Sequence, residues 1–172
     1  MTSTTLFYIF IGILIFNFLL DSCLDYLNAK HFKDELPPEL KDVYDEEEYQ
    51  KSQDYKATNQ KFSNLTSLFS LIVTLAFFFL DGFKFVDDLA RKFSDNSILI
   101  ALVFFGVIML ASDIITTPFS YYKTFVIEER FGFNKTTHKT FILDKLKGWL
   151  MLIVLGGGIL ALIVWFYETT GE

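Results

Sequence analysis

Four long apolar runs dominate the hydrophobic and polar pattern of this chain. They contain no Lys, Arg, Asp or Glu and cover residues 1–20, 62–80, 97–112 and 148–167. The third run continues past Asp113 to Tyr122. Each run approaches the roughly 20 residues that an α-helix needs to cross about 30 Å of hydrocarbon. The pattern therefore predicts an all-α integral membrane protein with four transmembrane helices, at about residues 4–28, 62–82, 96–117 and 144–167.

Two long polar segments, about residues 30–61 and 118–143, separate these helices. The first contains a proline pair, Pro37 and Pro38, which favours an extended turn. It continues with VYDEEEYQKSQDYKATNQKF, which lacks Gly and Pro. We expect an amphipathic helix there, one that can run on into the second span. A shorter connection of mixed charge, residues 81–95, joins the second and third spans.

The second polar segment has an unusual composition for a loop. Its first part, PFSYYKTFVIEERFGFN over residues 118–134, alternates aromatic with charged residues, whereas a generic loop is rich in Gly, Ser, Asn and Pro. We expect a loop that packs against another part of the protein. Beyond it, Asn134 or Thr137 can cap the last helix through a side-chain oxygen. The glycines at 156–158 weaken that helix but permit a close approach to a neighbouring one.

The distribution of Lys and Arg predicts the orientation in the membrane. Twelve of the 15 lie within residues 30–61 and 123–147, and cytoplasmic loops carry an excess of these residues. We therefore expect residues 30–61 and 118–143 to be cytoplasmic and both termini to be outside, in a bacterial periplasm or in the lumen of the endoplasmic reticulum. No Lys or Arg precedes the first run and no small-residue cleavage site follows it, so we expect a retained helix rather than a signal peptide.

Composition narrows the range of partners. The chain is 52% hydrophobic and contains 21 Phe, which makes the lipid bilayer its first partner. It has no basic, aromatic-interleaved surface of the kind that binds nucleic acid. Its glycine cluster lies inside an apolar run rather than in a phosphate-binding loop. The single cysteine, Cys23, excludes an intrachain disulfide.

Polar residues within the predicted spans are candidate site residues. Asn17, Asp21 and Asp25 recur at intervals of four and form one polar stripe on the first helix. A carboxylate facing lipid near the bilayer centre costs about 2.5 to 3.5 kcal/mol, so the stripe should face protein, water or the membrane interface. It either marks the interface or lines a hydrated cavity. Asp113, in the third span, is either a cavity-lining functional residue or a structural residue that faces the interface or the bundle.

The sequence indicates no catalytic or metal-binding residue. The two histidines, His31 and His138, do not belong to a His-Glu-x-x-His pattern. The acidic run from Asp45 to Glu48 is typical of a solvated helix face and has no histidine at ligand spacing. A catalytic zinc site needs about three protein ligands and a general base beside the bound water. We therefore assign no metal ligand to this chain.

Three segments carry a resemblance to a known family: PPEL at residues 37–40, EEYQKSQDY at 47–55 and PFSYYKTFVIEERFGFNKTT at 118–137. They resemble the amino-terminal membrane region of the zinc endopeptidases of the CAAX prenyl protease 1 family, and the resemblance spans nearly the whole chain. The matching positions are Lys51, Ser52, Tyr55, Pro118, Phe125, Val126, Ile127, Glu128, Glu129, Gly132, Phe133, Asn134, Thr137, Phe141, Asp144 and Lys147. The resemblance implies, for a full-length protein, a bundle of seven membrane helices around a water-filled chamber with zinc chemistry near its cytoplasmic side.

The family's His-Glu-x-x-His helix and its downstream glutamate are absent from residues 1–172. We therefore expect this chain to be the amino-terminal membrane domain of such a zinc metalloprotease, without the catalytic zinc domain and inactive by itself. Zinc is expected only in a full-length protein. Glu128, Glu129, Arg130 and Asn134 are expected to contact either the missing carboxy-terminal catalytic segment or a peptide substrate, prenylated or not. The alternative for these four residues is local loop and helix-cap bonding.

Two other functions remain open at the level of sequence. The chain can be a non-catalytic membrane scaffold or binding protein derived from the family, which keeps the chamber half without proteolysis. A small transporter is a further alternative, suggested only by polar residues in the spans.

Overall fold

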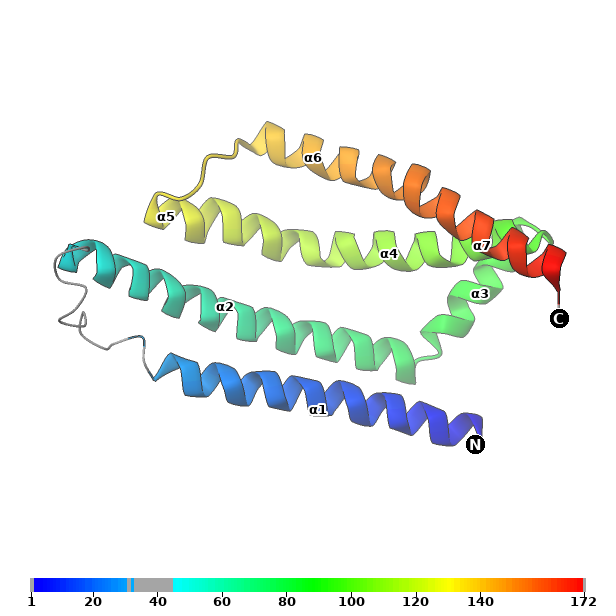
Figure 1. Ribbon diagram of the computed structural model, residues 1–172, viewed down its shortest axis with the longest axis horizontal. Helices are drawn as coiled ribbons and strands as arrows, with labels where there is room; N and C mark the ends of the chain where they lie inside the picture. Colours follow the sequence, from blue (N-terminus) through cyan, green and yellow to red (C-terminus); the bar gives the residue numbers. More distant parts are fainter. Residues whose placement is uncertain (1, 31, 33–44, 172) are drawn as a thin grey trace. The chain divides into compact units, whose positions relative to one another are not determined.

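The computed structural model of the chain describes residues 2–30, 32 and 45–171. All regular secondary structure in these residues is helical (Figure 1). The elements are α1 (Ser3–Ala29), α2 (Glu46–Phe79), α3 (Gly82–Phe93), α4 (Ser97–Tyr122), the π-helical η2 (Lys123–Glu128), α5 (Glu129–Phe131), α6 (His138–Met151), the π-helical η3 (Leu152–Gly156) and α7 (Gly157–Thr170). The turn predicted at Pro37 and Pro38 lies outside the described residues.

Four continuous helical stretches of the described chain are long and apolar enough to cross a membrane. They are Ser3–Ala29, Glu46–Phe79, Ser97–Phe131 and His138–Thr170. The predicted fold class, an all-α membrane protein with four spans, is therefore confirmed. Side-chain oxygens cap three of the helices as elementary capping rules require: Thr2 accepts from the Thr5 amide at 3.2 Å, Asn96 from Leu99 at 3.1 Å and Thr137 from Thr140 at 3.1 Å.

The second span begins earlier than the sequence predicted. Residues 46–61 were expected in the first polar segment, but α2 continues without a break for 34 residues from Glu46 to Phe79. This stretch has no Gly or Pro and is rich in Glu, Gln, Lys and Ala, which lose little side-chain freedom in a helix. Three glutamates in the first turn also suit the positive end of the helix dipole. The expectation that the helix predicted in the first polar segment can run on into the second span is therefore confirmed.

The prediction of a loop from Pro118 was wrong, because helix continues to Phe131. Pro118 lies inside α4, where it removes one backbone donor. Six residues then wind as the π-helix η2. Gly132 ends the helix with a φ of 77°, and the amides of Gly132 and Phe133 donate to the carbonyls of Glu129 and Glu128 at 3.0 and 2.8 Å. This pair of bonds is a Schellman ending, for which glycine carries no Cβ penalty.

The described chain divides into two compact units. One contains residues up to 76 together with 121–134, and the other contains 77–120 and the chain from 135 onward. In the first unit, α2 contacts α1 through Asn64 and Asp25, and it contacts α5 through Tyr55 and Phe131. The rings of Phe62 and Tyr122 stack there at 5.2 Å. In the second unit, α4 contacts α3 and α6.

Much of the apolar surface is exposed, as expected for a membrane protein. The buried hydrophobic residues among those described are Ile11, Val86, Ala90, Ile127 and Phe131. Many large apolar side chains along the four spans face outward instead. Such a surface would promote aggregation in water but is solvated by lipid.

Candidate functional site

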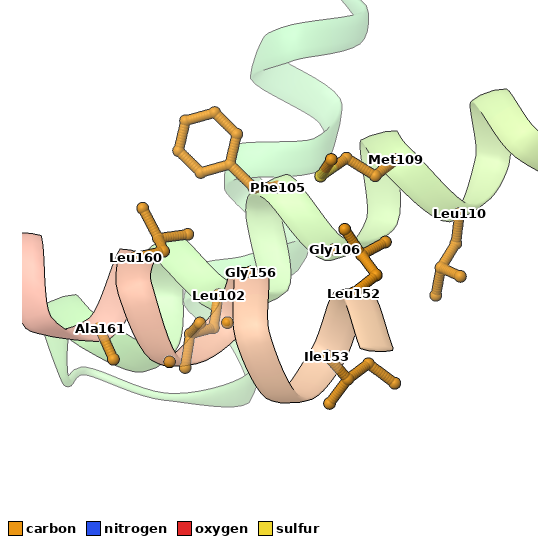
Figure 2. A pocket seen from close by; sticks show the side chains of 12 residues that line it. Leu102, Phe105, Gly106, Met109, Leu110, Leu152, Ile153, Gly156, Leu160 and Ala161 are labelled. Atoms are coloured by element: carbon orange, nitrogen blue, oxygen red, sulfur yellow. The ribbon is translucent and has the colours of Figure 1, made fainter. Parts of the chain in front are cut away.

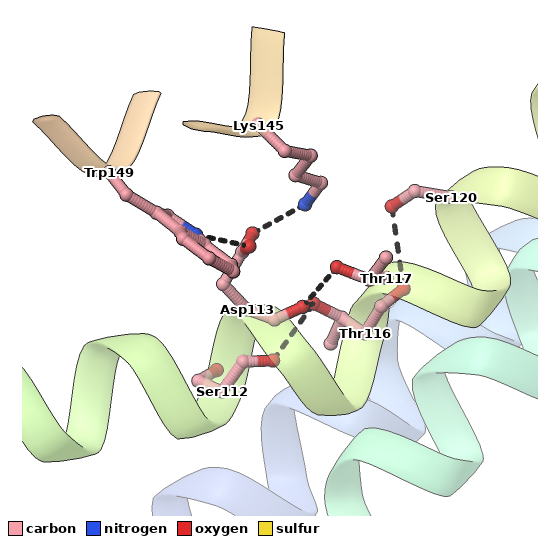
Figure 3. A network of polar contacts seen from close by, with 7 residues as sticks. All are labelled: Ser112, Asp113, Thr116, Thr117, Ser120, Lys145 and Trp149. Atoms are coloured by element: carbon pink, nitrogen blue, oxygen red, sulfur yellow. Dashed lines mark hydrogen bonds and ion pairs between the residues drawn. The ribbon is translucent and has the colours of Figure 1, made fainter. Parts of the chain in front are cut away.

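The carboxylate of Asp113 joins α4 to α6 in the second unit. Lys145 Nζ donates to one of its oxygens at 2.6 Å, and Trp149 Nε1 donates to the other at 2.8 Å (Figure 3). Lys145 and Trp149 are one helical turn apart on α6, so both point at the same place. Of the two readings of Asp113 from sequence, these contacts support a structural, bundle-facing role. Trp149 uses its indole N–H for this bond.

Hydroxyl groups bond to the backbone around Asp113 and up to Pro118. Thr117 Oγ1 donates to the Asp113 carbonyl at 2.6 Å, and Thr116 Oγ1 donates to the Ser112 carbonyl at 2.9 Å, with the Asp113 carbonyl farther away at 3.2 Å (Figure 3). Ser120 Oγ donates to the Thr116 carbonyl at 3.4 Å. Ser and Thr side chains satisfy backbone groups in this way next to proline in membrane helices. These hydroxyl groups are satisfied within α4 itself.

An aromatic cluster in the first unit joins two of the segments that resemble the protease family. The Tyr55 ring on α2 contacts the rings of Phe131 and Phe133, with centroids 5.3 and 4.7 Å apart. Lys51 Nζ lies 5.9 Å from the Phe133 ring centroid, within the range of a cation–π contact. Phe131 and Ile127 are buried. The expectation that residues 118–134 pack against another part of the protein is confirmed, and that part is α2.

The four residues expected to contact a catalytic segment or a peptide lie at the end of this helix. Asn134 Nδ2 donates to Glu129 Oε2 at 2.9 Å. The Glu128 carbonyl accepts from the backbone amide of Asn134 at 3.3 Å as well as from the backbone amide of Phe133. The Arg130 guanidinium is 5.5 Å from the ring of Phe131. Glu129 and Asn134 thus show the local loop bonding that was the alternative to contact with other molecules or segments. Contact with a carboxy-terminal catalytic segment or a peptide stays a prediction.

The polar stripe on α1 is brought partly into contact with α2. Asp25 is half-buried and faces Asn64; with the amide nitrogen of Asn64 toward it, the distance to Asp25 Oδ2 is 2.7 Å. Asn17 and Asp21 lie on the exposed surface of α1. Only the last residue of the stripe is therefore tied to a neighbouring helix here. Its role as the lining of a cavity stays a prediction.

An apolar groove of about 600 Å³ lies between α4 and the last helix of the second unit (Figure 2). Side chains such as Leu102, Phe105 and Met109 form one side, and Leu152 and Leu160 contribute to the other. A Cβ added at the glycine in position 157 would lie 3.5 Å from the Leu102 side chain, which is ordinary van der Waals contact. The groove has the chemistry to hold hydrocarbon.

Comparison with known proteins identifies the family. Residues 25–172 match the family described as CAAX prenyl protease N-terminal, five membrane helices. The chain belongs to this family. It is 31% identical to CAAX prenyl protease 1 of Saccharomyces cerevisiae over 91% of this chain and 37% of that protein. It is 39% identical to the probable CAAX prenyl protease 1 of Schizosaccharomyces pombe over 71% of this chain and 30% of that protein.

A crystal structure with the same fold as this chain is known. The crystal structure of S. mikatae Ste24p matches 95% of this chain with a TM-score of 0.88 and 32% sequence identity, and the match covers 40% of that chain. The resemblance stated from the three motifs is therefore confirmed. The chain spans less than half the length of each of these relatives.

The number of membrane helices and the set of possible metal ligands both differ from what the protease family leads one to expect. The family description counts five membrane helices, whereas four stretches of the described residues are long and apolar enough to span. Within residues 2–30, 32 and 45–171, no group of three His, Cys, Asp or Glu side chains could hold a metal ion. His138 is exposed at the start of α6, and His31 lies outside the described residues. The donor set of the described chain does not fit a zinc ion.

The residues that sequence reasoning missed are the partners of the polar groups. Lys145 had been counted only among the basic residues of the second polar segment, and Tyr55 had been named as a match to the family motif without a contact partner. A signal was available for the first: Lys145 and Trp149 are spaced by four on a helix entering the membrane, which places two donors on one face. No comparable signal links Tyr55 to the end of α5.

Proposed function

We propose that this chain is the amino-terminal membrane portion of a CAAX-prenyl-protease-like zinc metalloendopeptidase. In this proposal it contributes chamber wall and substrate-positioning segments, while a carboxy-terminal segment carries out peptide bond hydrolysis. The observation that carries the proposal is the family match over residues 25–172. The similarity to S. mikatae Ste24p over 95% of the chain supports it.

The chemistry of the described residues favours a supporting role. Hydrolysis by zinc needs about three protein ligands and a general base near the bound water, and the described residues bring no such set together. No step of the hydrolysis is assigned to them. Their contribution would be geometric, because positioning of reactants lowers a barrier without any proton transfer.

The end of α5 is the part of the chain that we propose for contact with the catalytic segment or the peptide. Its backbone is held by the Schellman bonds and by the bond from Asn134 to Glu129. The aromatic contacts of Tyr55 fix the same corner to α2. A corner held from both sides can present Glu128 and Arg130 at fixed positions. Asn17, Asp21, Asp25 and Asp113 stay proposed for the wall of the chamber.

The membrane orientation is also part of the proposal. The Lys and Arg distribution favours a cytoplasmic location for residues 30–61 and 118–143, with both termini on the opposite side. The relatives named above come from yeasts, which favours the endoplasmic reticulum over a bacterial inner membrane. The cytoplasmic corner at Glu128 and Arg130 would then lie on the side where zinc chemistry is expected.

A chimaera tests the proposal. The matching amino-terminal part of CAAX prenyl protease 1 of S. cerevisiae is replaced by this chain, and cleavage of a prenylated peptide and bound zinc are measured in detergent. We expect the chimaera to cleave the peptide, and the 172-residue chain alone to bind no stoichiometric zinc and to cleave nothing. Stoichiometric zinc and cleavage by the chain alone would contradict its reading as an incomplete enzyme. A folded, zinc-loaded chimaera without cleavage would contradict the positioning role.

Two sets of variants in the chimaera separate contact from local bonding. If Arg130 touches substrate or the catalytic segment, Arg130→Gln raises KM or lowers kcat while the melting temperature is unchanged. If Glu129 and Asn134 act only on each other, Glu129→Gln and Asn134→Ala lower the melting temperature non-additively and leave kcat/KM unchanged. Thr140→Ser, at the exposed start of α6, is the matched control.

A second candidate function is a non-catalytic binding protein of the same family. The apolar groove of about 600 Å³ favours it, because such a space can hold a hydrocarbon chain without any catalytic group. Binding of a fluorescent prenylated peptide to the chain alone, lost on Gly157→Leu, would support this candidate. Equal binding by the parent chain and Gly157→Leu would exclude the groove as the site.

A further inference from the structure

The short helix α3 joins two membrane spans but cannot itself cross the membrane. Its 12 residues from Gly82 to Phe93 extend only about 18 Å, against about 30 Å of hydrocarbon. The spans before and after it end at Phe79 and begin at Ser97. Because each crosses the bilayer once, these two ends lie at the same membrane surface. The helix α3 is therefore confined to that surface.

One flank of α3 packs on the protein. Gly82, Val86 and Ala90, spaced by four, are buried. The ring of Phe83 contacts the rings of Phe77 and Phe78 with centroids 4.8 and 5.0 Å apart. A Cβ on Gly82 would collide with the Phe77 ring, so glycine permits this close approach. These contacts fix which side of α3 faces outward.

A second apolar row runs beside the buried one and is largely uncovered. It consists of Phe85, Leu89 and Phe93, again spaced by four. Phe85 and Phe93 are 68% and 73% exposed, and Leu89 is half-buried. Two aromatic side chains this exposed on one short helix make the row an apolar strip, and such a surface is stable only against another apolar environment.

The remaining face of α3 is charged and suited to water. Arg91 Nε donates to Asp87 Oδ2 at 2.8 Å, and this hydrogen bond raises the pKa of the Arg91 guanidinium. Lys84 and Lys92 are exposed. Lysine side chains at an interface extend their ammonium groups to the headgroup level while their stems lie along apolar surface. The helix thus has an apolar side and a charged side, as an interfacial amphipathic helix does.

We propose that α3 lies in the membrane interface, with the row of Phe85, Leu89 and Phe93 inserted among the acyl chains of the leaflet beside it. Phe79 and Leu80 at the end of the preceding span are also exposed, so apolar side chains are exposed on both sides of the turn that joins α2 to α3. The occupant of the strip is therefore the bilayer that the spans already cross, and not a docked protein. Aromatic side chains at this depth would hold the connection between the two spans against vertical displacement.

Spin labelling of the full chain in phosphatidylcholine nanodiscs tests the depth of the row. Cys23→Ser provides the background, and single variants Phe85→Cys, Phe93→Cys and, as the matched control on the charged face, Asp88→Cys are labelled with a nitroxide. Collision with oxygen, which partitions into lipid, and with a water-soluble nickel chelate is then measured. We expect the labels at 85 and 93 to collide more with oxygen than with nickel, and the label at 88 to show the reverse.

Two results would overturn the proposal. Labels at 85 and 93 that are as accessible to nickel as the label at 88 would place the row in water. Labels at both positions that are shielded from both reagents would mean that protein covers the row. If a cysteine variant fails to fold, Phe85→Trp replaces it. The tryptophan fluorescence that this variant adds to that of the parent chain should be quenched in vesicles whose lipids are brominated near the headgroup end of their acyl chains. Quenching of the added fluorescence by aqueous iodide instead would refute insertion.

Discussion

Removal of the Asp113 carboxylate is the perturbation with the clearest expected cost. Asp113→Ala leaves the Lys145 ammonium and the Trp149 indole N–H without the oxygens they contact at 2.6 and 2.8 Å. Breaking a fully buried ion pair from one side costs about 3–5 kcal/mol. The side chains of Lys145 and Asp113 keep 25% and 34% of their exposure, and a lysine can extend toward water. We therefore expect a smaller loss of unfolding free energy, about 2 kcal/mol.

A double-mutant cycle isolates the pair itself. Asp113→Ala, Lys145→Ala and the double variant are unfolded reversibly in mixed micelles, and the expected coupling free energy is about 1–2 kcal/mol. The chain offers a matched control pair in Lys147 and Asp144, which lie 3.5 Å apart and are 72% and 61% exposed. Exposed pairs of this kind contribute about 0–1 kcal/mol. A coupling at Asp113 no larger than that of the control pair would refute the assignment of a stabilising role to the network.

Three further changes test individual parts of the fold by the same unfolding measurement. Gly132→Ala forces a Cβ into a left-handed conformation and should lower stability by about 1 kcal/mol, whereas Gly106→Ala, which meets open space, should raise it or leave it unchanged. Trp149→Phe keeps the ring but removes one donor to Asp113, for a loss of about 1 kcal/mol. Tyr55→Ala removes two edge-to-face contacts and should cost about 2 kcal/mol. An unchanged unfolding midpoint for Gly132→Ala, Trp149→Phe or Tyr55→Ala would contradict that contact's contribution.

The spans could be predicted because membrane physics leaves few alternatives. A run of about 20 residues without charge has to be a helix in lipid. The boundaries were harder to predict, as α2 and α4 show. Both continue as helix beyond their apolar cores into charged and aromatic sequence, and α4 does so through Pro118. Charge marks where a helix leaves hydrocarbon, and it does not mark where the helix ends.

The side-chain pairings could not be predicted from one sequence. Asp113 and its partners are 32 and 36 residues apart, and helical periodicity shows which face a residue occupies but not which helix lies opposite. Tyr55 and Phe133 present the same difficulty. The motifs that carry the family resemblance did indicate that both segments matter. Their contact emerges only when α2 and α5 are placed side by side in one unit.

Three carboxylates of the described chain, those of Asp113, Asp25 and Glu129, share a structural role. Asp113 joins α4 to α6, Asp25 faces α2, and Glu129 holds the turn after α5. Such groups serve to fix helices and turns. In the proposed enzyme they would keep the wall rigid, and a rigid wall is what substrate positioning requires.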